Sequence, residues 1–242
     1  MSVTSRTPRS RGGRSSSGHG RSRSSRGELV PHEADESLTR QERKQRTRQA
    51  LLDATLERLE DHSFGALSLR EVAREAGITP TAFYRHFESM EDLGLVLVDE
   101  SFRSLREMLR AGRSEVAAPG DEIRASVAIL VRHVHEHRAH FRFIARERSG
   151  GSAALRTAIR HEIRLFSSEL ATDLARYPVL RDLPTADLQM IASLIVSMMV
   201  SAVEAILDAP LDRPEVEDEI RTTAEQQMRL IVLGALQWRA AG

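Results

Sequence analysis

The chain has 242 residues and a formal net charge of zero, and its length suits one or two domains with a sizeable core. It contains no cysteine, which excludes disulfides, thiolate catalysis and cysteine-based zinc sites. Aromatic residues make up only 4% of the sequence while alanine, leucine and arginine abound, which favours helices over strands. The predicted fold class is therefore all-α.

Positive charge is concentrated at the N-terminal end. Residues 1–48 hold twelve lysine and arginine residues against five acidic residues, so the rest of the chain carries the acidic excess. Residues 1–37 are rich in arginine, serine and glycine and contain little that could be buried, which predicts disorder. This tract is either a cationic arm that adds phosphate contacts or a solvated tail without a specific role.

Residues 38–98 contain the signals for a compact set of helices. A first helix from about residue 38 has leucines at helical spacing and a basic leading edge that includes Arg48. Ser68, followed by Glu71, forms a capping box that begins a second helix, and Gly77 ends it. Thr79 and the proline after it open a third helix, and a long amphipathic helix runs from about residue 89 to 111.

Residues 99–242 are predicted to form a helical body. Apolar periodicity indicates helices at about 121–137, 139–148, 152–176, 185–208 and 214–239, so nine helices and no β-sheet are expected in the chain. The most apolar stretch, 191–207, is interrupted by serines and a glutamate and is shorter than the roughly 20 residues that span a bilayer. We therefore expect a buried helix there and a cytoplasmic protein that makes no membrane contact.

The segment 68–87 has the spacing of a helix-turn-helix. Its small shared core is predicted to consist of Leu69, Val72, Ala73, Ile78, Phe83 and Phe87. The side chains left exposed on its second helix carry hydroxyl, imidazole and guanidinium groups, which suit contacts with DNA phosphates and base edges. These residues are Thr79, Thr81, Ala82, Tyr84, Arg85 and His86. The alternative is that the two short helices are simply part of a bundle.

The string Phe83-Tyr84-Arg85-His86-Phe87, which follows a Ser-Leu-Arg-Glu-Val-Ala helix, closely resembles the TetR family of transcriptional repressors. The helix-turn-helix sequence and the later string Arg146-Glu147-Arg148-Ser149-Gly150 look like the FabR and DesT branch, which regulates unsaturated fatty acid synthesis. The resemblance implies that Tyr84 and His86 touch phosphates and that Thr79, Thr81 and Arg85 face the major groove. The full predicted DNA-binding set is Arg48, Ser68, Leu69, Arg70, Thr79, Pro80, Thr81, Ala82, Tyr84, Arg85 and His86.

The body offers apolar residues that could line a ligand pocket. The candidates are Phe102, Leu105, Met108, Phe141, Phe143, Ile144, Leu165, Phe166, Leu170, Ile195 and Met198. The resemblance implies a tunnel for long-chain acyl thioesters, in which Arg146 and Arg148 hold the phosphates of coenzyme A. An ordinary packed core and solvated salt bridges are the alternatives. A repressor of a drug-efflux or other catabolic operon, with a different small hydrophobic effector, is the alternative function.

The last two helices carry apolar stripes that are predicted to form a homodimer. One stripe consists of Leu188, Ile191, Ile195, Met199, Ala202 and Ile206, and the other of Val216, Ile220, Met228, Ile231, Ala235 and Trp238. Two recognition helices about 34 Å apart could then read a palindromic operator. Burial of the stripes within one chain is the alternative.

His133, His137 and His140 fall on one helix face, which raises the hypothesis of a metal site. The one nearby carboxylate, Glu136, is expected to point elsewhere, so we predict no metal and no cofactor but a surface-facing, pH-sensitive patch. The sequence contains no glycine-rich phosphate loop and no nucleophile elbow. An enzyme is therefore not expected.

Overall fold

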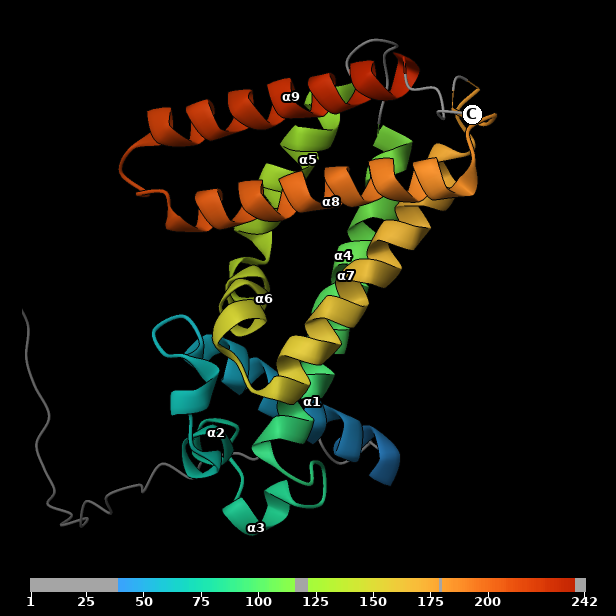
Figure 1. Cartoon of the computed structure of the whole chain (residues 1–242). Helices are drawn as coiled ribbons and strands as arrows, with labels where there is room; N and C mark the ends of the chain where they lie inside the picture. Colours follow the sequence, from blue (N-terminus) through green and yellow to red (C-terminus); the bar gives the residue numbers. More distant parts are fainter. Residues whose placement is uncertain (1–38, 116–121, 179, 238–242) are drawn as a thin grey trace, which may run out of the picture. The chain divides into compact units, whose positions relative to one another are not determined.

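The computed structural model describes residues 39–115, 122–178 and 180–237, with the backbone alone for residues 108–115. The described residues form nine α-helices and one short 3-10 helix, without a strand, which confirms the predicted all-α class (Figure 1). The elements are α1 (Arg40–Arg58), η1 (Phe64–Ala66), α2 (Leu69–Glu75), α3 (Pro80–Phe83), α4 (Met90–Glu115), α5 (Glu122–Glu136), α6 (Arg138–Gly150), α7 (Ala153–Leu174), α8 (Thr185–Asp208) and α9 (Pro214–Gln237). The tract 1–37 lies outside the described residues.

Local capping explains where the first helices begin and end. Thr39 caps α1 and Ser68 caps α2, and each forms a reciprocal capping box with the glutamate three residues later. Gly77 follows α2 with a φ of 70°, a left-handed conformation that glycine adopts without steric cost. Thr79 then accepts a hydrogen bond from the backbone N–H of Ala82 and begins α3. These are the starts and the turn that the sequence indicated.

One apolar core joins α1, α2 and α3 to α4, α6 and α7. The fully buried Phe83, the last residue of α3, contributes to it. Phe64 of η1 packs against Phe143 of α6 with ring centroids 5.7 Å apart. The core continues without a break through Leu97 and Phe102 of α4. The described residues from Thr39 onward form one compact unit, so the first helices are held directly against the body.

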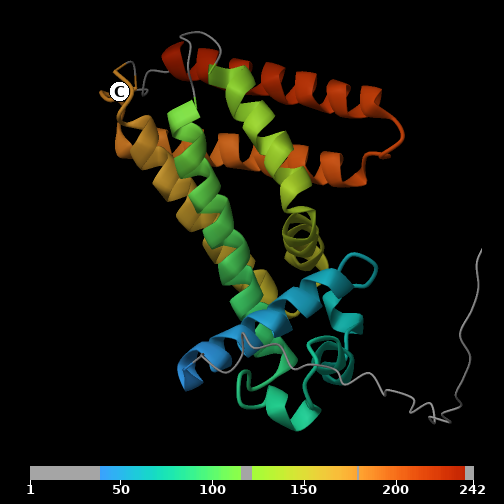
Figure 2. The same ribbon diagram turned by 180° about the vertical axis from the view of Figure 1, so that it is seen from behind.

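Two further cores lie among α5, α7, α8 and α9, where α8 and α9 run side by side (Figures 1 and 2). Among the described helices, α8 has the length and apolar composition of a membrane-crossing helix, but half of its most apolar window is buried inside the chain. Packing of α8 against α7 and α9 accounts for that apolarity, as expected for a core helix.

The stripes predicted to form a dimer interface are largely buried within the chain. Leu188, Ile191 and Ile195 of α8 belong to one internal core, and Ala202 and Ile206 belong to another. On α9, Met228 and Ala235 are also buried, and Trp238 lies outside the described residues. That part of the prediction is wrong, because these residues pack between helices of the same chain.

Candidate DNA-binding surface and ligand cavity

The side chains of residues 79–87 fall into a buried inner set and a solvent-facing outer set. Phe83 and Phe87 point inward, with ring centroids 5.7 Å apart and almost no exposed area. Tyr84 lies between them in sequence and is 63% exposed. Among the other residues predicted to bind DNA, Ser68, Arg70, Thr79, Pro80, Thr81 and Arg85 are exposed, and Leu69, Ala82 and His86 are half-buried.

Arg48 of α1 holds the chain just after α3. Its guanidinium lies over the ring of Phe87, 4.5 Å from the centroid, and its Nη1 donates to the backbone carbonyl of His86 at 3.1 Å. Both contacts use the side chain within the protein. Arg48 therefore positions the residues after α3, a role that its basic character in the sequence did not reveal.

The environment of His86 favours its neutral form. Burial lowers the pKa of His86, and the nearby charges of Lys44, Arg48 and Arg85 lower it further. A neutral imidazole donates one hydrogen bond and brings no charge to a phosphate. The positive charge near His86 comes instead from residues such as Lys44 and Arg85, both exposed.

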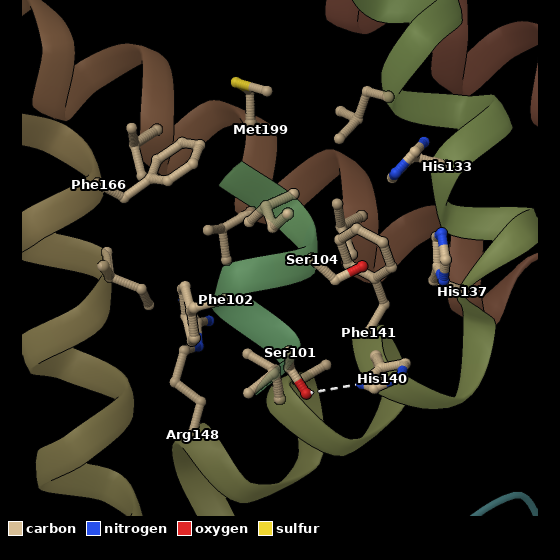
Figure 3. A pocket seen from close by; sticks show the side chains of 18 of the residues that line it. Ser101, Phe102, Ser104, His133, His137, His140, Phe141, Arg148, Phe166 and Met199 are labelled. Carbon is tan, nitrogen blue, oxygen red and sulfur yellow. Dashed lines mark hydrogen bonds between the residues drawn. The ribbon is translucent and has the colours of Figure 1, made fainter. Parts of the chain in front are cut away.

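A cavity of about 90 Å³ lies among α4, α5, α6, α7 and α8 (Figure 3). Six of the residues predicted to bind ligand line it: Phe102, Leu105, Phe141, Ile144, Arg148 and Phe166. Arg148 is paired with Glu204 of α8 at 2.7 Å, so the charges at the wall of the cavity compensate each other. The remaining lining is mostly apolar, which suits a hydrophobic ligand.

Other predicted ligand residues lie elsewhere. Ile195 and Met198 do not line the cavity, while Val196, Met199, Val200 and Val203 of the same helix do. Leu170 packs in the core of α7 to α9, Phe143 packs against Phe64, Leu165 is 40% exposed, and the side chain of Met108 lies outside the described residues. Ser101 and Glu204 also line the cavity, and the sequence did not predict either of them.

On the side of α6 that faces away from the cavity, two arginines form hydrogen bonds with the segment between α1 and η1. Arg146 Nη1 donates to the carbonyl of Leu59 at 3.1 Å, and Arg142 Nη1 donates to the carbonyl of Glu60 at 2.9 Å. Arg146 is thus directed away from the cavity that contains Arg148, so the two arginines do not meet around one phosphate group. They belong to two different contacts of the same helix.

The buried Glu147 adds another hydrogen bond between α6 and the region before α2. It is 5% exposed, and its Oε1 accepts a hydrogen bond from the backbone N–H of Phe64 at 3.3 Å. Burial raises the pKa of Glu147, which the Phe64 hydrogen bond and the charge of Arg146 oppose. A Cβ at Gly151 would lie 2.6 Å from both the backbone oxygen and the Oε2 of Glu147, so only glycine fits beside this carboxyl.

The three histidines lie at one wall of the cavity (Figure 3). The His133 and His137 ring centroids are 4.8 Å apart, and those of His137 and His140 are 6.2 Å apart. The expectation of a surface-facing patch is wrong, because the His133 side chain is 15% exposed and His140 Nδ1 contacts Ser101 Oγ at 2.9 Å. Burial lowers the pKa of both His133 and His140.

Two family models match the chain. Residues 51–95 match "Bacterial regulatory proteins, tetR family", and residues 119–234 match "Tetracyclin repressor-like, C-terminal domain". Between them, the two models account for most of the described chain.

Solved structures share the fold. A TetR-family transcriptional regulator from Rhodococcus sp. is 17% identical, with a TM-score of 0.60 over 77% of this chain and 98% of the other. A TetR-family regulator from Streptomyces coelicolor is 20% identical, with a TM-score of 0.59 over 77% and 96% of the two chains. The fatty acid degradation regulator FadR from Bacillus halodurans is 13% identical, with a TM-score of 0.51 over 76% and 94%.

Proposed function

The chain belongs to the TetR family of DNA-binding transcriptional regulators, and from this premise we propose that it is a homodimeric repressor whose operator affinity depends on a hydrophobic ligand. The observation that carries the proposal is that α6 contacts both the ligand cavity and the segment that leads into the DNA-binding helices. A ligand that moves α6 would therefore change the position of α2 and α3.

The proposed DNA contacts come from the outer set of residues around α3. Tyr84 is exposed while its neighbour Phe83 is completely buried, so packing of the phenylalanine fixes the direction of the tyrosine. Tyr84 and His86 would donate to phosphates, and Thr79, Thr81 and Arg85 would reach base edges in the major groove. Phosphate contacts add affinity for any sequence, and base contacts add specificity.

Replacement of Tyr84 or His86 by alanine is expected to weaken binding to specific and random duplexes alike. A hydrogen bond to a charged group contributes about 1.5–3 kcal/mol, so each variant should lose roughly 10- to 100-fold in affinity in a gel-shift titration. Tyr177→Ala is the matched control, because Tyr177 is 55% exposed and lies just after the end of α7. If both variants bind DNA like the parent, the phosphate roles are wrong.

A dimer through another face of α8 and α9 fits the exposed residues of these helices. Met190 and Leu194 of α8 and Leu230 and Leu233 of α9 are exposed. A Cβ at Gly234 would meet no atom of its own chain within 4 Å. Glycine within a helix costs about 1 kcal/mol relative to alanine, and its place beside two exposed leucines fits close approach by a helix of a second copy.

The ligand proposed first is a long-chain acyl thioester, and the regulated genes are those of unsaturated fatty acid synthesis. The support is the resemblance of the sequence to the FabR and DesT branch and the apolar lining of the cavity. At about 90 Å³ the cavity is smaller than the roughly 300–1,000 Å³ of typical ligand pockets. A long chain therefore requires Phe102, Phe141 and Phe166 to repack, and this rearrangement would be the movement transmitted by α6.

The size of the cavity favours a second candidate, a repressor that responds to a smaller hydrophobic effector, such as a substrate of an efflux pump. Such a ligand would enter with little rearrangement of the helices. The two candidates differ in how the protein responds to chain length, because only the first requires the cavity to grow.

Saturated and unsaturated long-chain acyl thioesters are expected to change the operator affinity of the parent protein in a gel-shift assay. Ala145→Phe, which places a ring in the cavity, should abolish this response while leaving binding to DNA without ligand intact. Leu165→Phe is the control, because Leu165 is 40% exposed and lies outside the cavity. Indifference of the parent to every thioester would reject the first candidate and favour the second.

A further inference from the structure

The junction of α5 and α6 brings two imidazoles and a carboxylate together. Glu136 is the last residue of α5, and His137 directly precedes α6. His133 lies one turn before His137 (Figure 3). One ligand atom from each of His133, Glu136 and His137 lies within 4.8 Å of the other two. We propose that these three residues bind a divalent transition-metal ion, with Zn²⁺ as the best match to their donor atoms.

The spacing along the helix supports this assignment. Histidines at positions i and i+4 lie on one face of a helix and can bind the same ion. Two nitrogens and one carboxylate oxygen, with a fourth position left to water, are a common ligand set for Zn²⁺. Ligand bonds of about 2.0–2.2 Å place the donor atoms of a tetrahedral site roughly 3.4 Å apart, so closure requires only small side-chain rotations.

Glu136 is already oriented toward the site. Its Oε2 lies 3.3 Å from Nδ1 of His133, at the separation that two ligands of one ion would have. The two groups do not meet in hydrogen-bond geometry, and the buried Nδ1 of His133 has no hydrogen-bond partner among the described residues. A buried polar atom without a partner costs free energy, and coordination to a metal ion would remove that cost.

The third histidine of this helix face lies outside the site. His140 takes no part, because its Nδ1 contacts Ser101 and it lies farther from His133.

The proposed metal site lies at the bend between α5 and α6. Between the end of α5 and the start of α6, His137 has φ −124° and ψ 35°, outside helical geometry. An ion held by His133, Glu136 and His137 would link the last turn of α5 to the residue at this bend. The proposal does not depend on the function proposed above, since it concerns binding of metal alone.

The test is a metal titration of the chelator-treated, full-length protein, without DNA. We expect one Zn²⁺ per chain to be taken from a chromophoric chelator, and Co²⁺ to give the intense visible absorption of a tetrahedral site. Glu136→Gln and His137→Gln should each weaken the affinity by more than about tenfold. The unfolding midpoint of each metal-free variant serves as the check that it folds.

Two control variants separate this site from the other histidines of the chain. His135→Gln removes an imidazole from the same helix, where it contacts Glu217 at 2.7 Å, and should bind metal like the parent. A double substitution of His19 and His32 should also leave the affinity unchanged. Absence of stoichiometric uptake, or uptake that survives in His137→Gln, or an equal loss in a control, would overturn the proposal.

Discussion

Replacement of Leu233 by glutamate is expected to turn the proposed dimer into monomers. Leu233 is 55% exposed on α9, next to Leu230 and Gly234, on the face assigned above to the second copy. Twofold symmetry introduces the substitution twice in one interface, where each buried charge costs several kcal/mol if it has no partner. The mass measured by light scattering on a sizing column should fall by half, and operator affinity should fall with it.

Leu211 provides the control for this experiment. It is 81% exposed in the connection between α8 and α9, so Leu211→Glu adds the same charge outside the proposed interface. That variant should keep the mass and the operator affinity of the parent. A dimeric Leu233→Glu variant, or a monomeric parent at the same concentration, would contradict the assignment of this face.

The DNA-binding helices were predictable because their signals are local. Ser68 and Glu71 form their capping box within one turn, and Gly77 and Thr79 act on the residues beside them. Such signals depend on backbone geometry over three or four residues. These helix ends can therefore be predicted without knowledge of the tertiary packing.

The arrangement of α8 could not be predicted in the same way. Leu194 is 51% exposed while the adjacent Ile195 is buried. Val196 and Met199 line the cavity, whereas the prediction chose Ile195 and Met198, one position earlier. A helix that is apolar on most of its circumference has no polar face to fix its rotation. Its orientation is decided by packing against α7 and α9, which a helical pattern read from α8 alone does not include.

The contacts of Arg146 and Arg148 in α6 were also not predictable from the neighbouring sequence. Arg148 pairs with Glu204, 56 positions away in the chain, and Arg146 donates to the carbonyl of Leu59, 87 positions away. Nothing near either arginine in the sequence distinguishes their roles. Glu136 was likewise expected to point away from the histidines, and the end of α5 instead turns it toward His133.

Replacement of Phe143 by alanine is expected to reduce both stability and the coupling between ligand and DNA. Phe143 is 1% exposed and packs against Phe64, so the cavity left behind should cost about 3–5 kcal/mol of unfolding free energy. The same contact joins α6 to the segment before α2. Any ligand that shifts operator affinity in the parent should therefore shift it less in this variant.

Phe141→Ala separates the two effects, because Phe141 lies on the same helix but lines the cavity. It is half-buried, so its loss should cost less in a denaturant titration than the loss of Phe143. It should alter the ligand concentration that gives half the response, while the largest change in operator affinity stays near that of the parent. If Phe143→Ala instead retains the full response, α6 does not transmit the signal through this contact. The hydrogen bonds of Arg142 and Arg146, and the core residues of α4, would then be the other routes from the cavity to the DNA-binding helices.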